Sequence, residues 1–174
     1  MELLGTHKVT FDLLRSIAIE CHALDVAAYH LFVDSTHLDG VEKTKAIYEE
    51  LMTSLLLNLA ISLRTKFYQG LDHRTTIPFV SHCGFLFKYA NNQEETVNFS
   101  IKDVCDKIVH ADSVSRYMEP EIRHPTTSFR GKDIRSNSTW ELSMSVNLFT
   151  EAVLNWIHHT ETNPPSISCS EIAQ

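Results

Sequence analysis

The length of the stretches without glycine or proline constrains the fold of this chain more than any other sequence feature. The 174 residues include only 5 Gly and 5 Pro, and neither type occurs in residues 9–33 or 41–69. Glycine and proline are the strongest interrupters of regular structure, and strands are usually much shorter than these two stretches. The sequence therefore predicts two long helices and argues against an all-β sandwich.

Apolar residues recur at helical spacing in both stretches, and the turn-forming segment 34–40 connects them. Because this connection is short, we expect the two helices to be antiparallel neighbours. The segment 55–63 of the second helix is apolar nearly all round. Such a helix needs cover on more than one side, from other helices or from a second copy of the chain, so we expect a homodimer.

Shorter elements are expected in the second half of the chain, where polar residues, glycine and proline interrupt the helical pattern. Ser100 with Asp103 has the pattern of a capping box, which marks a helix start. The expected elements are a strand at 84–90, a polar loop at 91–95, a helix at 101–112, a half-buried hairpin of 126–130 with 140–146, and a helix at 147–159.

These elements predict a mainly all-α fold, namely a four-to-five-helix up-and-down bundle with a small β-hairpin inserted before the last helix. We expect a single domain over residues 1–160 and a disordered tail over 161–174, where two prolines are adjacent.

Charge and cysteine usage exclude several classes of protein. The net charge of −7 at pH 7 excludes a protein that coats DNA with its whole surface. The four cysteines form no C-x-x-C pair, which argues against a zinc knuckle or a disulfide-rich secreted domain. Residues 1–6 lack the pattern of a secretion signal, and no uninterrupted apolar run is long enough to span a membrane. We therefore expect a cytoplasmic protein with reduced thiols and no membrane partner.

A cluster of titratable residues lies on the expected helix 101–112. At 100° per residue, Asp106, Lys107 and His110 fall on the side opposite the apolar stripe. The carboxylate would favour the protonated imidazole, and the lysine could hold a phosphate. We take these three residues as candidate catalytic groups, with an ordinary solvated helix face as the alternative.

Arg64 is a further candidate because it follows the apolar block 55–63 directly. A guanidinium next to apolar residues is seldom buried without an anion, and its fork fits a carboxylate or a phosphate. Arg64 is therefore expected to hold a phosphate, or alternatively to form an ion pair with an aspartate on the helix 101–112.

A basic segment stands out in this acidic chain. Residues 123–135 hold four basic side chains against one acid: Arg123, Arg130, Lys132 and Arg135. Such a patch can attract RNA or an acidic protein, whereas the alternative is that it keeps the edge of a hairpin soluble.

The ten histidines do not show metal-ligand spacing. His22 and His30 are eight residues apart, which places them about 12 Å apart along a helix, too far to share one ion. The sequence also lacks a Gly-rich phosphate loop, a G-x-S-x-G motif and an H-E-x-x-H motif. We expect no metal and no cofactor.

Three segments, in the order of the expected elements, resemble the HEPN superfamily (higher eukaryotes and prokaryotes nucleotide-binding domains). They are Leu-Ala-Ile-Ser-Leu-Arg at 59–64, Ser-Ile-Lys-Asp-Val-Cys-Asp-Lys-Ile-Val-His-Ala at 100–111 and Asn-Leu-Phe-Thr-Glu-Ala-Val-Leu-Asn-Trp at 147–156. The resemblance spans most of residues 9–159. Many members of that superfamily are dimeric, metal-independent ribonucleases of toxin, antiphage or RNA-processing systems, with an Arg-x4–6-His motif.

The resemblance implies that His110 acts as general base or acid while the RNA 2′-hydroxyl attacks the adjacent phosphate. Arg64, Lys102 or Lys107 would supply the cation that holds the phosphate. Cys105 stands where the arginine of the motif is common, and Asp106 where its asparagine is usual. Two functions therefore stay open: a metal-independent endoribonuclease, or a catalytically inactive dimeric helical module that binds protein or RNA.

Overall fold

Helices and strands contribute to one layered α/β structure in the described part of the chain. The computed structural model describes residues 8–34, 39–69, 76–90, 93–118, 125–133 and 138–162. Its elements are α1 (Phe11–Tyr29), the π-helical turn η1 (His30–Asp34), α2 (Val41–Tyr68), the 3-10 turn η2 (Ser81–Cys83), β1 (Gly84–Ala90), β2 (Gln93–Val97), α3 (Ile101–Val109), β3 (Ser113–Tyr117), β4 (Thr126–Asp133), β5 (Ser138–Ser145) and α4 (Val146–Thr162).

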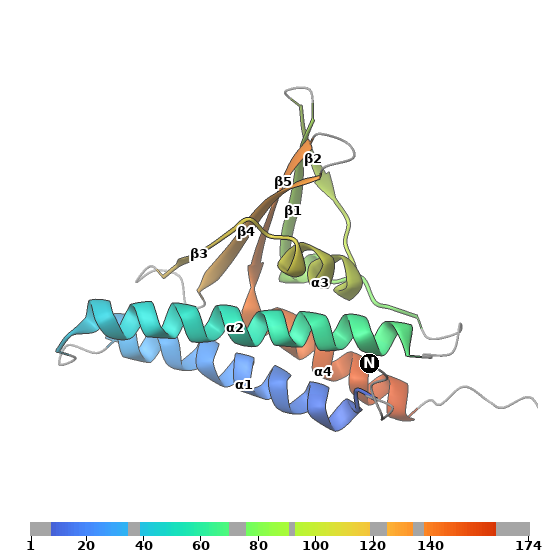
Figure 1. The fold of residues 1–174 in the computed structure, drawn as a ribbon, viewed down its shortest axis with the longest axis horizontal. Coiled ribbons are helices and arrows are strands. Elements are labelled where there is room, and N and C mark those ends of the chain that lie inside the picture. The colour runs from blue at the N-terminus through green and yellow to red at the C-terminus, as the bar shows by residue number, and fades with distance from the viewer. Residues whose placement is uncertain are drawn as a thin grey trace, which may run out of the picture.

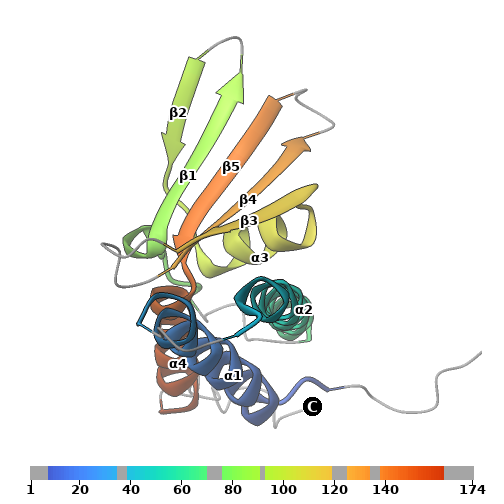
Figure 2. The same ribbon diagram turned by 90° about the vertical axis from the view of Figure 1, so that its left-hand side faces the viewer.

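The five strands form one antiparallel sheet in the order β2-β1-β5-β4-β3. The sheet stands above a layer formed by α1, α2 and α4, and α3 fills the angle between the two (Figure 1). Seen from the side, α3 lies behind β3 and β4, and none of the helices in the described residues crosses in front of the strands (Figure 2). One face of the sheet is therefore covered and the other is open.

This sheet shows that the prediction of a mainly all-α bundle with a small hairpin was wrong. The strand at 84–90 and the hairpin before the last helix are confirmed as β1 and as β4 with β5. The segment 91–95, predicted as a polar loop, instead contributes to β2, and β3 follows α3. Both missed strands lie at the edges of the sheet and are rich in polar residues, so their sequences carry little apolar alternation.

The helices were predicted more accurately than the sheet, because the sequence signals that mark a helix lie close together along the chain. Thr10 caps α1 by accepting a hydrogen bond from the backbone N–H of Leu13, and Ser100 forms the predicted capping box with Asp103 at the start of α3. As predicted, α1 and α2 run antiparallel (Figure 1). The last helix includes Glu161, which the sequence assigned to a disordered tail, and residues 163–174 lie outside the described residues.

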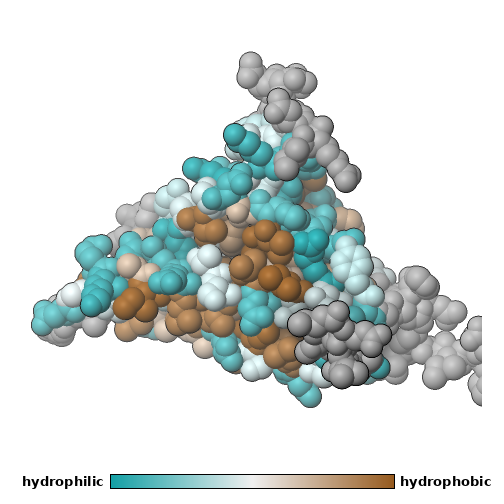
Figure 3. Space-filling model, in the orientation of Figure 1, coloured by the Kyte–Doolittle hydropathy of each residue, from teal (hydrophilic) through white to brown (hydrophobic). Residues whose placement is uncertain are grey.

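The apolar block 55–63 of α2 is covered on one side within this chain. Leu56, Leu59 and Leu63 are buried among residues of the common core. Ile61, on the other side of the helix, is 49% exposed, and apolar surface is visible along α2 in Figure 3. The sequence predicted that this block is covered on more than one side. Within the described residues, α1 and α3 pack against α2 but leave part of its apolar surface exposed.

Two helical stretches, residues 11–33 and 41–68, are long and apolar enough to cross a membrane by length and composition alone. In this fold they pack against each other and contribute buried side chains to the core. Core helices of soluble proteins pass the same test, so this finding does not place the protein in a membrane.

A buried ion pair ties the edge strand β3 to α1. Arg116 donates to Oδ1 of Asp25, and their side chains are only 3% and 1% exposed. The Arg116 guanidinium also lies 5.1 Å from the centre of the Tyr48 ring on α2. Three elements that are distant in sequence therefore meet at one charged side chain.

We expect Arg116→Leu to lower the free energy of unfolding by about 3–5 kcal/mol, because the Asp25 carboxylate then stays buried without its cation. The double variant Asp25→Leu/Arg116→Leu should recover much of this loss, since no charge is left in the core. Urea unfolding of the two variants measures the difference. Equal stability of the single variant and the unmodified protein would contradict this role of the pair.

Candidate functional site

A concave region of about 800 Å³ lies between the C-terminal end of α3 and the β4–β5 hairpin. We call it the His110 cleft. Its lining includes four of the residues selected from the sequence, namely Asp106, Lys107, His110 and Lys132. The remaining lining residues are Val109, Ala111, Asp112, Asp133 and Trp140. The fold thus brings one end of the predicted catalytic helix next to one residue of the predicted RNA-binding segment.

His110 lies at the end of α3, where its backbone N–H donates to the carbonyl oxygen of Asp106 over 3.1 Å. Its side chain is exposed, as its helical position predicts. Two residues later, the N–H of Asp112 donates to the carbonyl oxygen of Arg130 over 2.8 Å. This bond fixes the chain after His110 against β4, so the imidazole stands at the junction of helix and sheet.

Lys107 lines the cleft and contacts an aromatic ring there. Its ammonium lies 4.4 Å from the centre of the Trp140 ring, in the geometry of a cation–π contact. Burial, together with the nearby Lys88 ammonium, lowers the pKa of Lys107 below the usual value for lysine. An amine of this kind gives up its charge more readily than an ordinary surface lysine, and an incoming phosphate would restore its preference for the protonated form.

Gly131 permits the close approach of α3 to the hairpin. A Cβ at this position would lie 2.3 Å from Cζ2 of Trp140 and 2.9 Å from the backbone oxygen of His110. Any larger residue would therefore push the indole or the end of α3 out of place. This glycine, which the sequence did not indicate, is a requirement for the shape of the cleft.

Arg64 does not line the cleft, because it is engaged with Asp106. Its Nε lies 3.0 Å from Asp106 Oδ1, with the two side chains 27% and 37% exposed. This is the ion pair that the sequence offered as the alternative to phosphate binding. It joins α2 to α3, and it takes up the carboxylate that was expected to act on His110.

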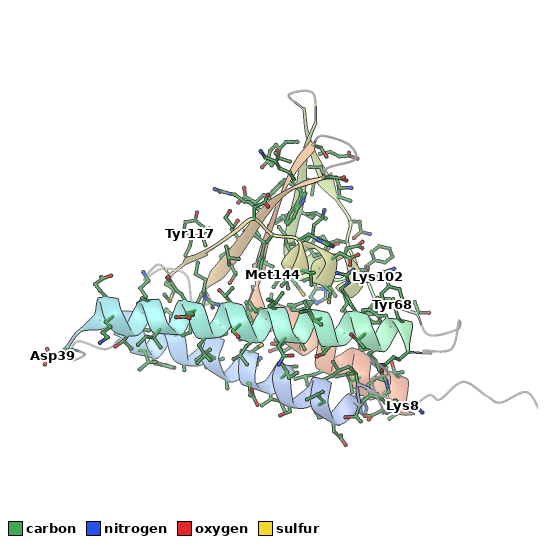
Figure 4. All side chains as sticks on the ribbon, in the orientation of Figure 1. Lys8, Asp39, Tyr68, Lys102, Tyr117 and Met144 are labelled. Atoms are coloured by element: carbon green, nitrogen blue, oxygen red, sulfur yellow. The ribbon has the colours of Figure 1, made fainter. Side chains whose placement is uncertain are left out.

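The residues predicted to bind RNA are spread over the molecule. Lys102 lies in the first turn of α3, with its ammonium 5.7 Å from the centre of the Tyr68 ring, at the end remote from His110 (Figure 4). Arg130 forms an ion pair with Glu141, with a distance of 3.0 Å from Nε to Oε2. Arg123 and Arg135 lie outside the described residues. Lys132 alone among the described members of this set lines the His110 cleft.

Cys105, which stands at the place of the common HEPN arginine, is fully buried. Burial, followed by the charge of Asp106, raises the pKa of its thiol far above the usual value, so it stays protonated. Cys105 therefore contributes to packing and supplies no reactive group.

Trp140, Asp112 and Asp133 are members of the cleft that the sequence did not single out. Trp140 alternates with polar residues in β5, so it appeared only as a core residue of a hairpin. Its pairing with Gly131 across the hairpin places it under α3. Only the three-dimensional contact between hairpin and helix could have identified it.

Within the described ranges, no three His, Cys, Asp or Glu side chains are grouped so that they could hold a metal ion. Comparisons with protein-family models, with curated proteins and with solved structures find no match to this chain. The chemistry of the cleft is therefore inferred from its own geometry.

The helix that carries His110 allows a direct test of this placement. Ile108 is 6% exposed, so Ile108→Asp would bury an unpaired charge and lower the free energy of unfolding by about 3 kcal/mol or more. His110→Ala removes an exposed side chain and should change stability by less than about 0.5 kcal/mol. Thermal melts compare the two variants, and equal losses would show that His110 is part of the core.

Proposed function

We propose that the His110 cleft binds single-stranded RNA and cleaves its backbone without a metal ion. The observation that supports this function best is the grouping of an exposed imidazole with two ammonium groups in one cleft. Histidine is the side chain whose ordinary pKa suits proton transfer near neutral pH, and ammonium groups complement phosphate charge. Membership of the HEPN superfamily and a cytoplasmic location are parts of this proposal.

In the proposed reaction, His110 accepts the proton of a ribose 2′-hydroxyl, whose oxygen attacks the adjacent phosphorus. The bond from phosphorus to the 5′-oxygen of the next nucleotide breaks, and a proton returns to that oxygen. The products are a 2′,3′-cyclic phosphate and a 5′-hydroxyl. Lys107 and Lys132 hold the phosphate, whose negative charge increases in the transition state.

Arg64 has a positioning role in this proposal. Its ion pair with Asp106 keeps α2 and α3 in register one turn before His110. Arg64→Ala would leave the Asp106 carboxylate free to draw Lys107 away from the phosphate. We therefore expect this variant to cleave more slowly, whereas Arg64→Lys, which keeps a cation there, should retain more of the activity.

The cleavage test uses a labelled single-stranded RNA in the presence of EDTA. The unmodified protein should leave 2′,3′-cyclic phosphate ends, and His110→Ala should lower the rate by at least about 100-fold, the scale of general acid–base catalysis. His158→Ala is the matched control, because this histidine is also exposed but lies on α4. Cleavage that needs magnesium, or that survives His110→Ala, would reject the mechanism.

A catalytically inactive dimeric module is the second candidate. It is favoured by the charges around the cleft, since Arg64 and Asp106 neutralise each other and Asp112 and Asp133 oppose the two lysines. Its binding partner would be a protein or RNA. An intact dimer that cuts no RNA would favour this candidate over the nuclease.

Both candidates include a homodimer formed through α2. On its exposed side, Ile47, Leu51 and Ile61 are 57%, 48% and 49% exposed and form one apolar stripe. Light scattering at micromolar concentration should give twice the monomer mass, and Leu51→Glu should reduce it to that of the monomer. Thr53→Glu, which adds the same charge at an exposed position of α2 beside this stripe, is the control. A monomeric unmodified protein would contradict the dimer.

A further inference from the structure

The face of the sheet that points away from the helices carries a row of aromatic rings. Phe85, Phe87 and Tyr89 alternate along β1, and successive ring centres are 6.0 Å and 6.5 Å apart. The first two rings are nearly parallel, with 20° between their planes. Phe85 is 60% exposed and Tyr89 is 37% exposed. We call this surface the open sheet face.

The pleat of the sheet explains why these rings are not part of the core. Leu86 of β1 and its partner Leu142 of β5 are buried on the covered side, so their neighbours in sequence point to the other side. In Figure 2 none of α1, α2, α3 and α4, the α-helices of the described part of the chain, lies in front of this surface. Three aromatic side chains in a row on an uncovered face exceed what chance exposure of single apolar residues produces.

Basic side chains lie in the same cross-strand rows as the rings. The register aligns Phe87 with Glu141 and Arg130, and it aligns Tyr89 with Thr139 and Lys132. Arg130 remains 56% exposed beside its partner Glu141. A hollow of about 270 Å³ is lined by Tyr89, Arg130 and Lys132, among others. A ligand on this face would therefore meet aromatic rings on one strand and cations two strands away.

We propose that the open sheet face binds single-stranded nucleic acid, with bases against the aromatic row and phosphates at Arg130 and Lys132. Flat bases stack on aromatic side chains whatever their sequence, and basic groups beside them hold the backbone. A purely apolar protein partner would use the aromatic row but would gain nothing from the adjacent cations. A duplex would also bind poorly, because its bases are already stacked on each other.

The open sheet face leads to the His110 cleft. Lys132, Asp112 and Trp140 line both the hollow next to Tyr89 and the cleft at the end of α3. A nucleic-acid strand held on the rings can therefore pass around the C-terminal end of β4, where Lys132 lies, toward the imidazole. Delivery to His110 rests on the proposed function, whereas binding on the open sheet face is independent of cleavage.

The binding test uses the full chain with His110→Ala, so that an RNA probe stays intact. Fluorescence anisotropy compares a labelled single-stranded RNA, a single-stranded DNA of the same sequence and an RNA duplex. Phe85→Ala and Phe87→Ala should each weaken single-strand binding by at least about fivefold, the lower end of the loss for one stacked base. Lys132→Ala should reduce the dependence of the affinity on salt by about one phosphate contact.

Tyr68→Ala is the matched control, since this ring is 70% exposed but lies at the end of α2. Circular dichroism of each variant shows whether the sheet is intact, and Phe85→Trp should bind as well as the parent because it keeps a ring. Equal binding of RNA and DNA assigns recognition to bases and phosphates, whereas a preference for RNA adds contacts to the 2′-hydroxyl.

The proposal is overturned if single strands do not bind the parent, if the aromatic variants bind like the parent, or if the duplex binds best. Single-strand binding by a protein that never cleaves RNA would leave the open sheet face standing and reject the nuclease. RNA cleavage at the parental rate by aromatic variants that no longer bind single strands would leave the nuclease standing and reject delivery of RNA from the open sheet face to His110.

Discussion

The short helix α3 holds the two layers of this fold together because nearly every side of it is engaged. Ile101, Val104 and Ile108 are buried, and the helix packs both on α2 and on β4. Its polar side is engaged as well, through the ion pair of Asp106 with Arg64 and the contact of Lys107 with Trp140. A nine-residue helix would be marginal alone, so tertiary contacts and its capping box must stabilise it.

The position of the candidate site follows from this constraint. The start of α3 is fixed by the bond from the N–H of Ile101 to the carbonyl oxygen of Pro78 and by the capping box at Ser100. Its end is fixed by the attachment of Asp112 to β4. His110 lies between these anchors and is nevertheless exposed. A rigid helix thus presents a titratable group at the rim of a cleft, which is the arrangement that proton transfer requires.

Sequence reasoning succeeded where the signal lies within one turn or one hairpin. The capping box at Ser100 and the exposure of His110 depend on spacing along one helix. The alternative that Arg64 pairs with an aspartate of the helix 101–112 joins two helices, and it rested on charge alone. The sheet order could not be predicted in this way, because β1 pairs with β5 across the whole intervening segment 91–137. The aromatic row was missed for the same reason, since only the finished sheet shows which side of β1 is uncovered.

The buried contact between α1 and β3 has a consequence for how this sequence can change. Asp25 and Arg116 are 91 positions apart, yet each is tolerated in the interior only because the other is present. Replacement of one of the two residues leaves the other as an unpaired buried charge, whereas replacement of both by apolar residues of similar size leaves no unpaired charge at this contact. Among descendants of this chain, we therefore expect positions 25 and 116 to change together. A descendant that keeps only one of the two charges would need a different arrangement of β3 against α1.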